Sequence, residues 1–434
     1  MSKHAIPTTT SAASAPTPPT DSGTPAPART PVATLPTRHW LSAGWVMTAS
    51  GWSANQFSAL LGSYRSELGL TAAGTTALFG IYVLGLIPGL LLGGPLADRR
   101  GRRPVVFLAL GTSALATCLL MIGPAASAFL WPGRFLTGIG AGALLTAGSV
   151  WVKELSSPPY GTAPNPGVAA RRSGLFLSAG FATGGLAASL IAQWAPHPMV
   201  TAYLPHLFLS ALAALCAARA PESSPAHPGT ASSAPAPVAR REQRASAAEF
   251  RRLVAPVAPW VFIAPTVAFA TLPGLVDADL KGWQTVYAGV ITAVTPGAGI
   301  LVAPLARSLA ARHRLATGAI GLAAVALGLL IAAFAAAQAQ PVVALIASMV
   351  LGAGYGLCVA YGLTEVAALA PSHRLARLTS YFWTLAYLGF LAPYVITLCT
   401  GVFSPPTVLI GAAVLAVFTL VAIAYRGTRR ARAH

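Results

Sequence analysis

Charged and amide side chains that could bind ions or polar groups are few in this sequence, and they stand among long apolar stretches. Residues 94–103 read GPLADRRGRR, so Asp98 lies among arginines, while the flanking residues 83–94 and 104–129 carry no charge. A carboxylate beside guanidinium groups forms charge-assisted hydrogen bonds. Arg134 and the adjacent amides Asn55 and Gln56 lie within other apolar stretches, where a polar group normally faces a cavity or a partner.

The surrounding sequence predicts that these residues are held by membrane-spanning helices. Of the 434 residues, 55% are hydrophobic and only 9% are charged, which is too little charge to cover a soluble protein of this size. Twelve apolar stretches approach the ~20 residues that a helix needs to cross a bilayer. They show no alternation of polar and apolar residues, so helices fit better than barrel strands. We expect an all-α integral membrane protein with spans at about 40–62, 73–96, 104–123, 127–150, 173–194, 200–218, 255–275, 284–307, 316–336, 342–365, 378–400 and 404–425.

The distribution of charge argues for a membrane rather than a nucleic-acid partner. The formal net charge is +18, a value also typical of nucleic-acid-binding proteins. On a twelve-span topology, however, nearly all Lys and Arg residues fall on one side; Arg65 and Lys281 fall on the other, and Arg134 lies within a span. Such a bias is the positive-inside rule. It predicts a multi-pass protein of the cell membrane (plasma or inner) with both termini in the cytoplasm and no nucleic-acid partner.

The longest polar interruption divides the chain into two halves of six spans each. Glu154 and then Arg171-Arg172 follow the fourth span, and the same order of acid and base recurs after the tenth span, which indicates a duplication. Paired six-span halves are typical of secondary transporters. The expected organisation is a disordered cytoplasmic tail (1–37), an N-terminal six-helix bundle (38–218), a cytoplasmic Pro/Ser/Ala-rich basic linker (219–253), a C-terminal six-helix bundle (254–426) and a basic cytoplasmic tail (427–434).

The charged segment also carries a resemblance to a known family. GPLADRRGRRP resembles the signature loop of the major facilitator superfamily, Gly-x-Leu-Ala-Asp-Arg-x-Gly-Arg-Arg/Lys, and lies between the second and third spans as in that family. The resemblance covers roughly residues 40–425. The matching residues are Gly94, Leu96, Ala97, Asp98, Arg99, Gly101, Arg102 and Arg103.

The resemblance implies that this loop is a conformational latch, which holds the two halves together on the cytoplasmic side. Glu154, Arg171 and Arg172 would extend the latch. Gly101 supplies the positive φ that so short a turn requires. The alternative is that these charges only fix the topology, but Asp98 contributes little to orientation.

Two weaker matches lie in the fourth and fifth spans. Arg134 with Gly138 and Gly140 resembles the family's Arg-x-x-x-Gly-x-Gly pattern, and Gly180 with Gly184 resembles part of a pattern of members that export by antiport. In the second case Gly185 stands where that pattern has proline. We expect these four glycines to let helices approach closely.

In the family's fold the first, fourth, seventh and tenth spans line a central cavity. No carboxylate lies at mid-membrane depth, so coupling to protons rests on the resemblance alone. The candidate residues for a cavity that takes the substrate or the coupling ion are Asn55, Gln56, Arg134, Trp52, Phe269, Tyr355 and Tyr361.

The sequence thus predicts a monomeric secondary active transporter that works by alternating access and exports a small organic substrate, drug-like or a metabolite, by proton antiport. The alternatives are an uptake permease of the same fold and a non-transporting membrane sensor. An enzyme is not expected, because no paired acids, His cluster or nucleophile–base pair lies in the spans. Neither a cofactor nor a metal is expected. The cysteines, which all fall in predicted spans, indicate neither disulfides nor a metal site: Cys118, Cys216, Cys358 and Cys399.

Overall fold

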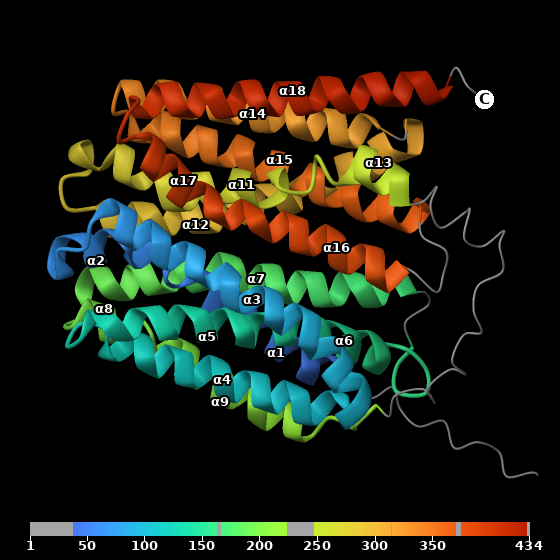
Figure 1. Ribbon diagram of the computed structural model, residues 1–434. Helices are drawn as coiled ribbons and strands as arrows, with labels where there is room; N and C mark the ends of the chain where they lie inside the picture. The colour runs from blue at the N-terminus through green and yellow to red at the C-terminus, as the bar shows by residue number, and fades with distance from the viewer. Residues whose placement is uncertain (1–37, 163–165, 224–246, 314, 370–374, 432–434) are drawn as a thin grey trace, which may run out of the picture. The chain divides into compact units, whose positions relative to one another are not determined.

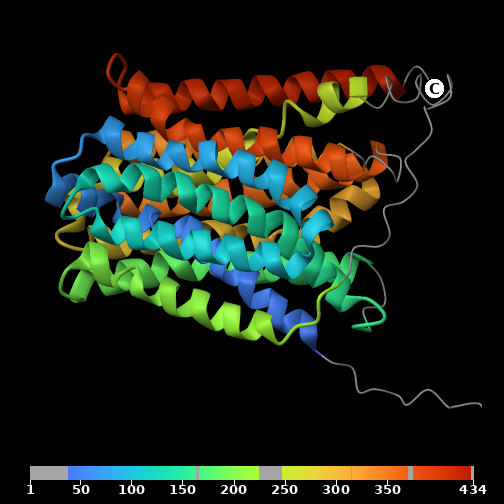
Figure 2. The same cartoon turned by 60° about the horizontal axis from the view of Figure 1, so that its bottom comes forward.

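The computed structural model describes residues 38–162, 166–223, 247–313, 315–369 and 375–431, and every regular element within them is helical. The long helices lie side by side along a common direction, as two views show (Figures 1 and 2). Within this part of the chain, ten helices are long and apolar enough to cross a membrane. The predicted all-α membrane fold is therefore confirmed. The expected N-terminal tail and most of the expected linker lie outside the described residues.

The first half runs from α1 to α9. Its third helix, α3, begins where Thr71 accepts a hydrogen bond from the backbone N–H of Gly74 at 3.0 Å, and it ends at Arg100, just before Gly101. The helices of this half are α1 (His39–Asn55), α2 (Leu61–Leu68), α3 (Ala72–Arg100), α4 (Arg102–Ile122), α5 (Leu130–Ala143), α6 (Ser149–Ser156), α7 (Pro166–Trp194), α8 (Pro198–Thr201) and α9 (Leu204–Ala218), with 3-10 turns at Ser58–Leu60 and Ser127–Phe129 and a π-helical turn at Leu144–Gly148.

The second half runs from α11 to α18. Its helices are α11 (Trp260–Thr266), α12 (Gln284–Leu301), α13 (Ala303–Arg312), α14 (Ala316–Ala337), α15 (Pro341–Leu369), α16 (Leu375–Tyr387), α17 (Ala392–Cys399) and α18 (Pro405–Ala431), with π-helical turns at Phe250–Val254 and Val267–Thr271 and 3-10 turns at Pro273–Leu275, Asp277–Leu280 and Leu388–Leu391.

Two of the twelve expected spans are absent from the ten, because the continuous helix in each is too short to be counted. The span at 40–62 consists of α1, a 3-10 turn and α2, and α2 ends at Gly69 with a φ of 63°. The span at 255–275 begins with a turn at residues 255–259 and continues with α11, the π-helical turn Val267–Thr271 and the 3-10 turn Pro273–Leu275, with Pro265 inside α11. A proline removes a helical hydrogen bond, and π-helical turns interrupt the regular pattern. Both spans are thus interrupted helices.

The halves are joined most closely at one end. We call the end at the turn of residues 99–103 the basic end, and the opposite end the far end. The main contacts between halves pair α7 with α12 and α3 with α17. Toward the far end of the first pair, the Gln193 amide donates to the Gly282 carbonyl at 3.0 Å, and the rings of Trp194 and Trp283 lie 6.1 Å apart.

Two further contacts continue this seam toward the middle of the helices. A Cβ atom added at Gly289 would overlap the Ser189 side chain, and one added at Gly185 would lie 2.6 Å from the Thr292 hydroxyl oxygen. At the basic end, by contrast, α6 packs on α1 and α7 of its own half, and α13 packs on α12, α14 and α15 of its own half. The seam between the halves is therefore tightest from the middle to the far end.

Candidate functional site

The charged segment forms a tight turn between α3 and α4 at the basic end. Gly101 has a φ of 94°, a conformation that a residue with a Cβ atom rarely adopts. A Cβ atom at this position would also lie 3.0 Å from the carboxyl carbon of Glu222. The turn therefore requires glycine for two reasons, its backbone angle and the close approach of an acid.

Arg102 is the centre of an ion-pair network at this turn. Its side chain is only 8% exposed, and it pairs with Asp98 at 2.5 Å and with Glu154 at 3.1 Å. A second hydrogen bond runs from Arg102 Nε to Glu154 Oε2 at 3.3 Å, so the guanidinium binds this carboxylate in a two-pronged manner. Two carboxylates thus offset the buried charge of one arginine.

An acid that the sequence interpretation placed in the linker completes the network. Glu222 accepts the backbone N–H groups of Arg102 at 2.6 Å and of Arg103 at 2.9 Å, which are orphan donors at the start of α4. A carboxylate at a helix N-terminus also interacts favourably with the helix dipole. The adjacent Ser223 donates to Glu154 at 2.5 Å. The signal that could have found Glu222 is its position: it is one of few acids, and it lies just beyond the sixth span on the side of the basic turn.

The same short segment is held by two aromatic side chains. The Trp151 indole donates to the Pro221 carbonyl at 3.2 Å, and the Tyr160 hydroxyl donates to the Glu222 carbonyl at 3.2 Å. Because Trp151 is fully buried, these contacts fix residues 221–223 against the first half.

The side chains of the other predicted latch residues do not join this network. Arg99 and Arg171 are exposed, and Arg103 has its guanidinium 5.9 Å from the Phe107 ring. Arg172 stacks instead on the Trp40 ring at 4.0 Å. Gly94 is not at a close helix contact, because a Cβ atom added there would touch only Thr146. The neighbouring Gly93 is the residue that packs on α5 and on the π-helical turn after it.

Arg134 is buried in an aromatic cage in the first half. Its side chain has no exposed surface, and its guanidinium carbon lies 4.2 Å from the Phe57 ring, 4.9 Å from the Tyr82 ring and 5.8 Å from the Phe79 ring. Its Nε donates to the Leu78 carbonyl at 3.3 Å. Cations are attracted to the faces of aromatic rings. A lone Arg in a spanning helix costs about 2.5–3.5 kcal/mol on insertion scales, so this cage offsets part of that penalty.

Several buried polar atoms around the middle of the first half lack a hydrogen-bond partner among the described residues. They are both terminal nitrogens of Arg134, both amide atoms of Gln56, the indole N–H of Trp52 and the hydroxyl of Tyr82. Asn55 differs, because its amide donates to the Phe181 carbonyl at 2.8 Å and accepts from Ser58 at 3.1 Å. Asn55 therefore joins α1 to α7, while Gln56 retains its full hydrogen-bonding capacity.

The aromatic residues expected in the cavity have different surroundings. Phe269 meets Phe79 of the other half edge-on at 6.1 Å. Tyr355 lies 6.0 Å from Phe262. Tyr361 is apart from both, since its hydroxyl donates to the Leu253 carbonyl at 3.3 Å.

A larger aromatic cluster at the seam was not predicted. Phe390 lies 5.4 Å from Phe79 and 5.5 Å from Tyr82 of the first half, and 4.8 Å from Phe262 of its own half. Tyr387 stacks on Phe262 at 4.5 Å. Single aromatic residues in apolar spans resemble ordinary packing residues, so only the fold reveals the cluster.

The four glycines singled out in the sequence lie where helices touch. A Cβ atom at Gly138 would overlap the Tyr82 carbonyl, and one at Gly180 would overlap the Thr48 carbonyl. Gly184 faces Trp52, with 2.8 Å from an added Cβ to the Trp52 Cα, and Gly140 faces α4. These positions bring α5 against α3 and α4, and α7 against α1.

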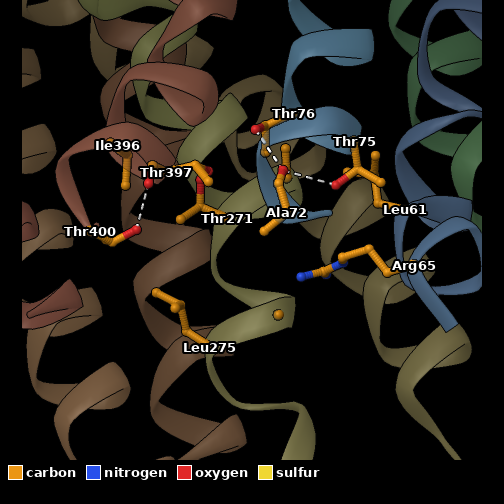
Figure 3. Close-up of a pocket in the computed structure, with 12 residues that line it drawn as sticks. Leu61, Arg65, Ala72, Thr75, Thr76, Thr271, Leu275, Ile396, Thr397 and Thr400 are labelled. Carbon is orange, nitrogen blue, oxygen red and sulfur yellow. Dashed lines mark hydrogen bonds between the residues drawn. The ribbon is translucent and has the colours of Figure 1, made fainter. Parts of the chain in front are cut away.

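A small cavity opens at the far end between the halves (Figure 3). Its volume is about 90 Å³, and its walls come from α2 and α3 on one side and from residues 270–275 and α17 on the other. Arg65 extends into it, and the Thr271 hydroxyl has no hydrogen-bond partner among the described residues. Thr75, which lines the cavity, is one helical turn along α3 from Phe79. The cavity thus lies closer to the far end than the cage around Arg134 does.

The sequence and the fold are similar to those of known proteins. The sequence pattern of the Major Facilitator Superfamily matches residues 41–393 of this chain. A segment of 76 residues is 38% identical to multidrug resistance protein MdtL of Klebsiella pneumoniae (strain 342); it covers 18% of this chain and 19% of that protein, so the match spans about a fifth of the curated relative.

Solved transporter structures share the whole architecture. A mutant of peptide transporter POT has a TM-score of 0.71 at 17% identity, covering 90% of this chain and 94% of that chain. Nucleoside transporter NupG has a TM-score of 0.66 at 14% identity, covering 90% and 99%. D-xylose-proton symporter has a TM-score of 0.62 at 16% identity, covering 87% and 96%. Identities this low show the fold alone, but the family match spans most of the sequence, and the chain belongs to the Major Facilitator Superfamily of membrane transporters.

Proposed function

We propose that this chain is a secondary active transporter that exports a small organic substrate by alternating access, with its basic end and both termini in the cytoplasm of a cell membrane. The observation that carries this proposal is the uneven seam. The halves are packed from the middle to the far end, whereas α6 and α13 at the basic end pack within their own halves. Such a seam supports a state that takes up substrate from the basic side.

The positive-inside rule supports the cytoplasmic assignment of the basic end. Arg99, Arg100, Arg102 and Arg103 cluster there, while Arg65 and Lys281 belong to the far end. Export rather than uptake is supported by the glycines of α7 and by the short match to a multidrug resistance protein.

The latch and the substrate site belong to the same proposal. In the latch, Asp98, Arg102, Glu154 and Glu222 hold the turn of residues 99–103 in one shape, and the loop meets the second half when the transporter faces the other way. The proposed substrate site is distinct from the small far-end cavity: at this site, Arg134 and Gln56 from the first half and the aromatic cluster around Phe390 contact the substrate as the halves move.

Proton antiport is the coupling that we propose. The family relationship is its only support, because the acids near the spans lie at the span ends and not at mid-membrane depth. In liposomes that contain the purified chain, substrate movement should follow an imposed pH gradient. Movement that is independent of the gradient would remove proton coupling and leave export standing.

A drug-resistance screen tests export directly. Cells with and without the chain are grown against a broad panel of toxic compounds, and intracellular accumulation of each is measured. Export predicts lower accumulation and higher resistance for some compounds in cells that carry the chain. Higher accumulation would favour an uptake permease, and unchanged accumulation of every compound would favour a non-transporting sensor.

A further inference from the structure

The Arg134 guanidinium is a buried charge that no acid of the described residues neutralises. No carboxylate among them lies within 4.0 Å, whereas Arg102, the other deeply buried arginine, has two. The Arg134 cage is built from rings and one backbone carbonyl. Burying an uncompensated charge is costly, so an anion that reaches this site gains a strong interaction.

The two terminal nitrogens of the Arg134 guanidinium, which are the donors that an oxyanion binds, are available for hydrogen bonding. Phe57 and Tyr82 lie beside the guanidinium, and Leu78 accepts from Nε, but Nη1 and Nη2 have no partner among the described residues. A carboxylate pairs with two guanidinium N–H groups side by side. The Tyr82 hydroxyl, also buried and unpartnered, belongs to the same cage and can donate a further hydrogen bond.

The wall between Arg134 and the seam consists of residues that contact the moving half. Phe79 and Tyr82 border the guanidinium on one side and meet the Phe390 ring of the second half on the other. Separation of the halves at this seam removes Phe390 from that wall. A substrate held between the halves would then meet aromatic rings first and the guanidinium behind them.

We infer that the transported substrate is an organic anion, with an aromatic or otherwise apolar body and a compact acid group that pairs with Arg134. This inference rests on the transport function proposed above and narrows its substrate class. It narrows the expectation of a drug-like compound or a metabolite, because a compound without an acid group leaves the charge of Arg134 uncompensated.

The test compares compounds that differ only in charge. Proteoliposomes that contain the full chain are loaded with indole-3-acetate, indole-3-acetamide or tryptamine, with 1-naphthoate and 1-naphthamide as a second set, at a pH at which the acids are ionised. Movement of each compound is measured with and without an imposed pH gradient. The acids are expected to move at least about tenfold faster than their amides, the factor that one charge-assisted hydrogen bond supplies.

Variants then assign the preference to the site. Arg134→Gln should lower the ratio of acid to amide transport to about one, and Tyr82→Phe should lower the same ratio. Arg65→Gln, which alters the far-end cavity, should leave the ratio unchanged. Tyr82→Phe keeps the ring, so it tests the site even where Arg134→Gln fails to fold.

The outcomes separate the two proposals. Equal or faster movement of the amides or the amine by the wild-type chain overturns the anion and leaves transport standing. An acid preference that survives in Arg134→Gln, or that disappears in Arg65→Gln, also overturns the assignment to Arg134. Movement of none of the compounds counts against both proposals.

Discussion

The carboxylate of Glu222 accepts the backbone N–H of Arg102 at 2.6 Å, across 120 positions of sequence. The same arginine pairs through its side chain with Asp98 and Glu154. One residue is thus held at its backbone by the segment after α9 and at its side chain by α3 and α6. The segment that leads into the linker is therefore part of the turn between α3 and α4.

Glu222→Gln should lower the thermal stability of the chain. The amide keeps one acceptor oxygen but loses the charge that favours a helix N-terminus. Loss of a helix cap costs about 1 kcal/mol, which for a large domain corresponds to a fall in the unfolding temperature of about 2–4 °C. Thermal unfolding of the purified chain in detergent measures this shift.

Glu67→Gln is the matched control, because Glu67 is an exposed acid at the far end. It should leave the unfolding temperature unchanged. If the two variants melt alike, the cap on α4 does not contribute to stability.

Asp98→Asn should reduce transport strongly with little effect on folding. Asp98 is 61% exposed, and exposed ion pairs contribute only about 0.2–1 kcal/mol to stability. A latch, however, needs this acid when the loop changes partners. Transport in proteoliposomes, together with the amount of chain inserted in the membrane, measures both effects.

Arg100→Gln removes an exposed charge of the same turn and serves as the control for topology. It should keep both insertion and transport. Full transport by Asp98→Asn would show that these charges only orient the chain.

Much of the fold could be predicted from the sequence, because uncharged apolar stretches of about 20 residues indicate membrane-spanning helices. The interruptions are harder to predict. Pro265 is visible in the sequence, but the composition of the span does not mark the π-helical turns at Phe250–Val254 and Val267–Thr271. The break after Asn55 is of the same kind, since its amide bonds to Phe181 on α7.

The candidate site was only partly predictable, for a physical reason. Asp98 and Arg102 are four positions apart, so their pairing is local. Glu222 is distant in sequence and stands in a stretch with the composition of a linker, so only its position just beyond the sixth span points to the basic turn. The rings around Arg134 belong to apolar spans, and their common position exists only after α3, α5 and the break that follows α1 have packed together.

Labelling of engineered thiols should place the two ends on opposite sides of the membrane. In a background without the native cysteines, Arg100→Cys should react with an impermeant maleimide only after cells are permeabilised. Gly62→Cys, in an exposed position toward the far end where an added side chain meets no neighbour, should react in intact cells. Labelling of position 100 in intact cells would reverse the assignment of the basic end to the cytoplasm.

A disulfide across the seam should stop transport. An added Cβ at Gly289 would overlap the Ser189 side chain, so cysteines at both positions come within bonding range after a small shift. Oxidation of Ser189→Cys, Gly289→Cys should consume both thiols and abolish transport, because α7 and α12 can no longer separate, and a reductant should restore it. The pair Ser189→Ala, Gly289→Ala has similar bulk without the bond and should be insensitive to oxidant. A crosslinked chain that still transports at its full rate would mean that the halves need not part at this seam, and the alternating-access proposal built on the seam would fail.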